Sequence, residues 1–273
     1  MPQTLVPALE SRGVLVGGGK TAVMGILNVT PDSSSDGGLW FRPSDAIDRG
    51  LKMWSQDAQI IDIGGESTRP GGAKRVGADE EWKRVAPVVK ELVSQGVAVS
   101  IDTVHSSTAS RALDAGVILV NDVSGGRYDP GMARVCADAD SAMVVQHWRG
   151  FPSDRALDMN YGDVVRDVAR ETLEQVEDVL AAGLPRGRVV IDPGLGFGLR
   201  NQDSWAVAES LDDFVALGFP VLVGASRKRF VAERFGSEVE AGTTFVTQLA
   251  AAAGVWAVRV HDVAASVAAV AEV

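Results

Sequence analysis

The chain has 273 residues and a formal net charge of −10 at pH 7, and 46% of its residues are hydrophobic. That apolar content suffices for a sizeable core and excludes an intrinsically disordered chain. The negative charge argues against a general binder of nucleic acid or anionic membranes, because their phosphates would repel it. The single cysteine, Cys136, excludes an internal disulfide framework and a cysteine-cluster zinc site.

No apolar run approaches the ~20 residues that a membrane-spanning helix needs. The N-terminal segment also lacks the charged stretch and apolar stretch of a secretory signal. We therefore expect a cytoplasmic protein that has no membrane partner.

Short runs rich in β-branched residues alternate with longer amphipathic segments along the chain. The apolar runs are continuous, which is typical of strands buried on both faces. We expect strands at residues 23–29, 58–63, 98–102, 117–121, 142–146, 188–192, 220–224 and 255–260. We expect helices at residues 44–55, 79–94, 106–115, 130–139, 163–182, 203–217, 228–235, 242–253 and 263–271, the first with Ser44 as its N-cap.

Eight strand–helix repeats predict an α/β fold, a (β/α)8 TIM barrel that forms one domain over residues 1–273. The alternative is an open doubly wound sheet. The count of eight and the lack of a G-x-G-x-x-G motif after a strand argue against it. Residues 1–20 precede the first strand, and we expect a short hairpin at the bottom of the barrel.

Polar residues end most of the expected strands, and enzymes with this fold carry their active sites at the carboxyl ends of the strands. One group is rich in acceptors and would suit an amino-heterocycle with several N–H donors: Asp62, Asp102, Asn121 and Asp192. A second group is cationic and follows strands seven and eight, where such barrels often bind phosphate: Arg227, Lys228, Arg259 and His261. Each residue alone is equally consistent with a helix cap or a surface ion pair. Together they predict two separate subsites for an amino-heterocycle that carries a phosphate or diphosphate.

Two loops are long, glycine-rich and charged, as mobile active-site loops tend to be. They follow the first strand, at residues 30–38, and the second strand, at residues 64–76. Asn28, with Asp32 or Asp36 nearby, would hold Mg²⁺ on a diphosphate through oxygen ligands. Each of these three residues alone is more simply explained as part of a turn or a cap.

Seven sequence blocks point to a known family. They are MGILNVTPDSSSDGG, DIGGESTRPGG, SIDT, NDVSGG, IDPGLGFG, GASRKRF and RVHDV, and they span roughly residues 22–270. In this order they resemble dihydropteroate synthase of folate biosynthesis. The enzymes of that family join a dihydropterin diphosphate to p-aminobenzoate and release pyrophosphate, with Mg²⁺. The resemblance therefore implies a transferase, these two substrates, Mg²⁺ as cofactor, and the homodimer usual in the family.

The resemblance also implies site residues. The pterin would be bound by Asp62, Asp102, Asn121, Gln146, Asp192 and Lys228. The p-aminobenzoate pocket would comprise Ser34, Thr68, Pro70, Phe197 and Arg229, bordered by Lys228. The diphosphate would be bound by Asn28, Arg69, Arg259 and His261, with Asn28 also contacting Mg²⁺. The catalytic residues would be Asp36, Asp102, Asp192, Lys228 and Arg259 in an SN1-like reaction.

Three positions depart from the family pattern. Ser34 stands where the family loop has Phe, and the loss of an aromatic cover predicts a weaker p-aminobenzoate site and altered sulfonamide binding. Gln146 stands where Met is common, so an amide faces the ligand or a buried water. Arg229 stands where Ser is frequent, and it either adds a cation near the carboxylate of p-aminobenzoate or faces solvent. Lineage drift is the alternative for all three.

Two other functions fit the pterin site. A pterin-dependent methyltransferase would need no diphosphate site, so the cationic group argues against it. A non-catalytic pterin-binding paralogue would be expected to lose Asn28, Asp36 or Arg259, and all three are present.

Overall fold

The computed structural model describes residues 20–30, 42–66, 75–151, 154 and 157–273 of the chain. Its centre is a sheet of eight parallel strands in the order β6-β5-β4-β3-β2-β1-β8-β7. The strands are β1 (Ala22–Asn28), β2 (Ile60–Gly64), β3 (Val99–Asp102), β4 (Leu119–Asp122), β5 (Ala142–Gln146), β6 (Val189–Asp192), β7 (Leu222–Val223) and β8 (Ala257–Val260). A parallel bridge between Ile191 and Val221 joins the two ends of the sheet. The predicted (β/α)8 barrel is therefore confirmed, and the open sheet is wrong.

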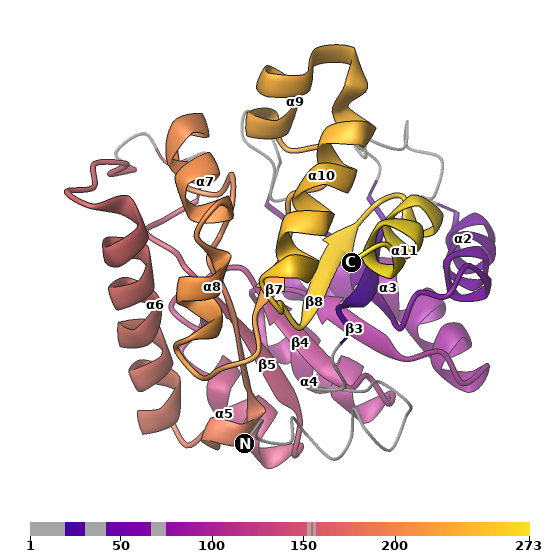
Figure 1. The fold of residues 1–273 in the computed structure, drawn as a ribbon. Coiled ribbons are helices and arrows are strands. Elements are labelled where there is room, and N and C mark those ends of the chain that lie inside the picture. The colour runs from indigo at the N-terminus through magenta and orange to yellow at the C-terminus, as the bar shows by residue number, and fades with distance from the viewer. Residues whose placement is uncertain (1–19, 31–41, 67–74, 152–153, 155–156) are drawn as a thin grey trace.

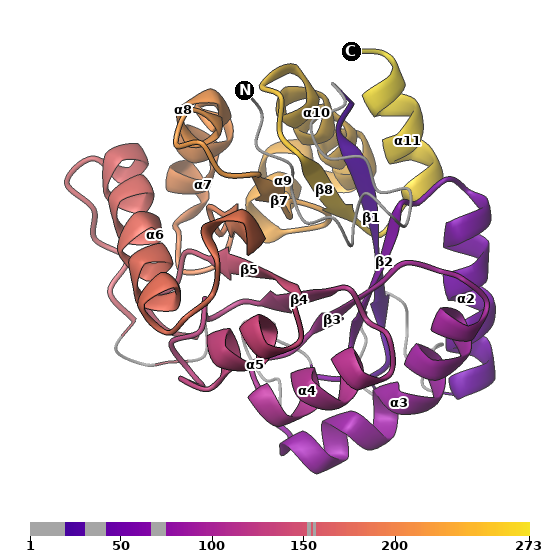
Figure 2. The same ribbon diagram turned by 90° about the horizontal axis from the view of Figure 1, so that it is seen from below.

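The helices lie around the strands, as the view along the barrel shows (Figure 2). They are α2 (Pro43–Ser55), α3 (Ala78–Ser94), α4 (Ser106–Asp114), α5 (Met132–Asp138), α6 (Val164–Ala181), α7 (Asn201–Ala208), α8 (Leu211–Val215), α9 (Arg229–Phe235), α10 (Val239–Ala252) and α11 (Val263–Ala271). Short 3₁₀ turns at Arg186–Arg188 and Gly236–Glu238 precede β6 and α10. Figure 1 shows α9 at one end of the barrel, beyond the end of α10. None of the described helices is long and apolar enough to cross a membrane.

Two apolar clusters explain why the strands read as continuous hydrophobic runs. The larger one fills the space between the barrel and its helices and includes Ile61, Val89 and Phe214. The smaller one fills the inside of the barrel and includes Met24, Leu119 and Trp256. Because every strand except β3 contributes to both clusters, little alternation between apolar and polar residues remains.

Several expected boundaries are wrong. The single helix expected at residues 203–217 is two helices, because Ser210 leaves the helical conformation (φ −125°, ψ 32°) between α7 and α8. Serine competes for backbone hydrogen bonds and so favours helix ends. Helix α2 begins with Pro43, whose fixed φ suits the first helical position, so the N-cap is Arg42 and not Ser44. Strand β7 has two residues instead of five. Residues 1–19, which hold nearly all of the expected hairpin, lie outside the described part.

Candidate functional site

The predicted acceptors meet at the carboxyl ends of neighbouring strands. The register pairs Gly64 with Asn28 and with Asp102, and it pairs Asp102 with Asn121. Gln146 and Asp192 form the equivalent pair on β5 and β6. Paired positions on parallel strands place their side chains on the same face, so these residues border one mouth of the barrel.

Asp62 lies deeper than the sequence suggested. It was expected to end its strand, but β2 continues to Gly64, and Asp62 pairs with Ser100 below the level of Asp102. Its side chain is fully buried. Its Oδ1 accepts from the Ser100 hydroxyl at 2.5 Å, and its Oδ2 accepts from Nδ2 of Asn121 at 3.0 Å. Both oxygens of Asp62 are therefore occupied by protein donors.

Arg259 of β8 joins the acceptor group. Its Nε lies 2.5 Å from Oδ2 of Asp62, and its second terminal nitrogen donates to Oδ2 of Asp102 at 2.6 Å. The acceptor and cationic groups are thus not the separate subsites that we expected, because a half-buried guanidinium needs carboxylates to offset its partial desolvation. The same ion pairs hold β8 against β2 and β3 across β1.

The other predicted cations are distributed around this centre. Arg227 adopts a left-handed backbone conformation (φ 57°), and its Nε donates to Oε1 of Glu240 on α10 at 2.6 Å. Nζ of Lys228 donates to the carbonyl oxygen of Leu195. Nδ1 of His261 lies 2.9 Å from the hydroxyl of Ser226.

The loop after β6 brings a carboxylate and a lysine to the mouth. The backbone N–H of Gly194 donates to Oδ1 of Asp192 at 2.7 Å, which fixes that carboxylate. Gly196 has a φ of 69°, and a Cβ there would lie 2.9 Å from Cδ of Lys228. Only glycine lets the loop approach the lysine side chain so closely. Phe197, a predicted wall of the p-aminobenzoate pocket, is buried with Val104, Val123 and Phe151.

Burial dominates the electrostatics of the site. It raises the pKa of Asp102 to about 7, against the opposing effect of Arg259. Burial likewise raises the pKa of Asp192, and Lys228 opposes that shift. Burial lowers the pKa of Lys228 to about 8, although Asp192 favours its charged form. Groups with such shifted pKa values at a barrel mouth are typical of an active site.

Five predicted site residues lie outside the described part of the chain: Ser34, Asp36, Thr68, Arg69 and Pro70. Arg229 is described and exposed at the start of α9. Asn28, in the last position of β1, is half-buried. The functional roles that the sequence suggests for these residues stay predictions.

Several supporting residues were not predicted from the sequence. Ser100 lies two residues before Asp102 on β3, so alternation along a strand would have placed both on one face. Arg49 of α2 donates to the carbonyl oxygen of His261 at 2.9 Å. Gln175 of α6 is fully buried and donates to the carbonyl oxygen of Gln146 at 2.8 Å. Nothing in the local sequence around Arg49 or Gln175 distinguishes either from other helix residues.

Comparisons with known proteins agree in family and in fold. The chain matches the family described as "Pterin binding enzyme" over residues 24–261. The dihydropteroate synthase of Mycobacterium leprae is 48% identical over 255 residues, covering 90% of this chain and 89% of that protein. The structure of Xanthomonas albilineans dihydropteroate synthase with 4-aminobenzoic acid has a TM-score of 0.84 and 39% identity, covering 93% of this chain and 92% of that one. That of Anaplasma phagocytophilum dihydropteroate synthase with bound 6-hydroxymethylpterin-monophosphate has a TM-score of 0.83 and 31% identity, covering 93% and 98%.

The ion pair beneath the site is testable by Asp62→Asn. The change removes a buried charge that Arg259 needs, and breaking a buried pair typically costs about 3–5 kcal/mol. Because Arg259 keeps Asp102 as a partner, we expect the free energy of unfolding in urea to fall by roughly 2–4 kcal/mol. Glu177→Gln, on the exposed face of α6, is the control and should leave stability unchanged. Equal stability of the two variants would contradict this role of Asp62.

Proposed function

The chain belongs to the dihydropteroate synthases of the pterin-binding enzyme family, and from this premise we propose how its own residues carry the reaction. The reaction condenses 6-hydroxymethyl-7,8-dihydropterin diphosphate with p-aminobenzoate and gives 7,8-dihydropteroate and pyrophosphate. Relatives with this name match about 90% of the chain, so neither the methyltransferase nor the non-catalytic paralogue is retained.

The observation that carries the pterin site is a set of acceptor oxygens without partners. Four side-chain oxygens accept no hydrogen bond from the described residues: Oδ1 of Asp102, Oδ1 of Asn121, Oε1 of Gln146 and Oδ2 of Asp192. None of the four is among the described polar atoms that are buried without a partner, so each remains open to solvent. A pterin edge carries an amino group and ring N–H groups, which would donate to these oxygens.

Lys228 supplies a hydrogen-bond donor beside these acceptor oxygens. Its ammonium group lies near Asp192 and now donates to a backbone carbonyl. We assign it the donation to the carbonyl or ring nitrogen of the pterin, at the border with p-aminobenzoate. Asp62 has no open acceptor among its described contacts, so its contribution to pterin binding is to hold Asn121 and Arg259.

The diphosphate would lie beside Arg259 and His261, with Arg69 from the loop after β2. One terminal nitrogen of Arg259 makes no hydrogen bond to the described residues and is left for a phosphate oxygen. Guanidinium groups suit that role because they donate in a planar fork. Asn28 contributes an amide oxygen beside Gly64.

Mg²⁺ fits this arrangement as a partner of the substrate. No cluster of three or more His, Cys, Asp or Glu side chains able to hold a metal occurs among the described residues. Mg²⁺ is commonly bound through one or two protein oxygens together with substrate phosphates and water. Asn28 would supply such an oxygen, and the ion would neutralise charge on the diphosphate.

Charge also explains the order of steps that we propose. Arg259 and Arg69 stabilise the departing diphosphate. The carboxylates of Asp102 and Asp192, with Asp36, offset the positive charge that remains on the pterin. The amino group of p-aminobenzoate then attacks the methylene carbon, and the resulting positive nitrogen gives its extra proton to the released diphosphate or to water. The attack needs no strong base because an aniline nitrogen is neutral at pH 7.

The p-aminobenzoate pocket would be formed by Phe197 and Arg229, with Ser34, Thr68 and Pro70. The absence of an aromatic ring at Ser34 supports our proposal that sulfonamides bind differently from their binding to family members with Phe. We further propose a cytoplasmic homodimer. Alanine-rich residues 249–271 and the exposed Phe245 on α10 are consistent with a helical interface.

The direct test is pyrophosphate release by the purified protein with the pterin diphosphate and Mg²⁺. Release should require p-aminobenzoate. Arg259→Ala should lower kcat by about 100- to 1,000-fold, as loss of a donor to developing negative charge does. Arg134→Ala, which removes an exposed arginine paired with Asp138, is the control. Near-normal turnover by folded Arg259→Ala would overturn the assignment.

Arg229 offers a test of substrate specificity. Arg229→Ser should raise the KM for p-aminobenzoate about two- to fivefold, the effect of losing one exposed ion pair. The KM for the pterin diphosphate should stay constant. Arg134→Ser on α5, an exposed arginine paired with Asp138, controls for net charge. If both variants give the same KM for p-aminobenzoate, Arg229 faces solvent only.

A further inference from the structure

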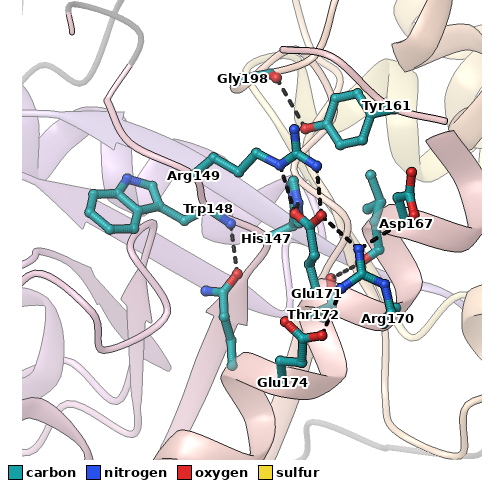
Figure 3. A network of polar contacts seen from close by, with 12 residues as sticks. His147, Trp148, Arg149, Tyr161, Asp167, Arg170, Glu171, Thr172, Glu174 and Gly198 are labelled. Atoms are coloured by element: carbon teal, nitrogen blue, oxygen red, sulfur yellow. Dashed lines mark hydrogen bonds and ion pairs between the residues drawn. The ribbon is translucent and has the colours of Figure 1, made fainter. Parts of the chain in front are cut away.

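A second polar network lies behind the pterin site, between β5 and α6 (Figure 3). Its central residue is His147, which directly follows Gln146 and has 1% of its surface exposed. Nε2 of His147 lies 3.0 Å from Oε2 of Glu171 on α6. Neither residue was predicted to belong to the site.

Glu171 is held tightly by cations. Arg149 donates from Nε to Oε2 at 2.7 Å and from a terminal nitrogen to Oε1 at 2.6 Å. Arg170 donates to Oε1 at 3.1 Å. The hydrogen bonds from Arg149, and to a lesser extent that from His147, hold the pKa of Glu171 far below its usual range against the opposing effect of burial. The Arg149 guanidinium stacks 3.9 Å from the centre of the Tyr161 ring, which fixes the arginine in turn.

The main chain of His147 contacts both ends of the turn that orients Asp192. Its N–H donates to the carbonyl oxygen of Asp192 at 2.8 Å. Its carbonyl oxygen lies 3.0 Å from the position of a Cβ on Gly194, so the two backbones are in close contact. Gly194 is the residue whose N–H holds Oδ1 of Asp192. A shift of His147 would therefore move the Asp192 carboxylate.

The side chain of His147 also lies among charged groups. An ionised carboxylate only accepts hydrogen bonds, so Nε2 of His147 carries the proton in its contact with Glu171. Nδ1 of His147 is buried and has no hydrogen-bond partner among the described residues. The charged groups that act on Asp192 are Lys228, Arg259 and His147. Those facing His147 are Glu171 and Asp192, with the Tyr161 ring beside it.

Stability alone is a poor reason for such a network. Replacement of a buried ion pair by apolar residues is often neutral or stabilising, because desolvation offsets the attraction. Here the side chains of His147, Glu171 and Arg149 are 1%, 14% and 19% exposed, so that cost applies. The arrangement is better explained by what it orients.

We propose that Glu171 and His147 are positioning residues for pterin binding: through the backbone contacts of His147 they hold the Asp192 carboxylate in the orientation that accepts the pterin N–H. The inference rests on the proposed role of Asp192 as a pterin acceptor. It adds a layer from α6 that the family resemblance did not supply.

The test compares Glu171→Gln with Glu174→Gln. Glu174 lies one turn further along α6 and pairs with Arg170 only, so its variant is matched in chemistry and helix. For Glu171→Gln we expect the KM for the pterin diphosphate to rise about tenfold, as when a partner that orients a binding group is lost. The KM for p-aminobenzoate should change less than twofold. Glu174→Gln should match the wild type in both.

The pH profile distinguishes a lost orientation of the Asp192 carboxylate from a general loosening of the fold. Without its contact to Glu171, His147 can shift together with the turn at Gly194, and Asp192 then loses part of the Gly194 hydrogen bond that lowers its pKa. The acid limb of kcat/KM for the pterin diphosphate should therefore move to higher pH in Glu171→Gln. Arg149→Lys, which keeps the charge but loses the two-pronged contact with Glu171, should move it in the same direction by less.

Asp192→Asn in the same assay distinguishes the proposed role of Asp192 in pterin binding from the proposed positioning role of Glu171 and His147. If Asp192→Asn raises the KM for the pterin diphosphate while Glu171→Gln behaves like Glu174→Gln, the positioning proposal is overturned and the pterin site stands. If Asp192→Asn leaves that KM unchanged, both the role of Asp192 and the positioning proposal fail. A raised pterin KM with a shifted acid limb in Glu171→Gln alone among the two α6 variants supports the proposal.

Discussion

The half-buried guanidinium of Arg259 is the charge on which the mouth of the barrel depends. It needs two carboxylates, and Asp62 and Asp102 supply them from β2 and β3 at 2.5 and 2.6 Å. Arg259 stands 197 residues from Asp62 along the chain, and only the pairing of β8 and β2 with β1 brings them together. Formation of the barrel and assembly of the site are therefore coupled.

This constraint divides the polar side chains of the mouth into two layers. In the lower layer, Asp62 uses both oxygens on Ser100, Asn121 and Arg259, so it is satisfied within the protein. The upper layer consists of the four acceptor side chains of Asp102, Asn121, Gln146 and Asp192. Each of them has one oxygen that accepts no hydrogen bond from the described residues. The lower layer thus holds the upper one in place, and the upper one is left for a ligand rich in N–H donors. The same logic extends outward to α6, where Glu171 and His147 support Asp192.

The sequence predicted the barrel well because its strands are buried on both faces and its polar residues cluster near strand ends. It failed where the decisive contact is distant. The position of Asp62 within β2, rather than at its end, follows from pairing with β3, and the contact of Arg259 with the acceptor group follows from closure. The pairing of His147 with Glu171 spans 24 residues, and local spacing does not indicate it. The break between α7 and α8 falls at Ser210, where serine favours a helix end, and the apolar run at residues 220–224 does not indicate that β7 has only two residues.

The most direct measurement is a crystal structure of the protein with a 6-hydroxymethylpterin bound. We expect hydrogen bonds of about 2.7–3.2 Å from the pterin N–H groups to at least three of the open oxygens of Asp102, Asn121, Gln146 and Asp192. Arg259 should remain paired with Asp62. A pterin bound without those oxygens, or one that displaces Arg259 from Asp62, would contradict the account.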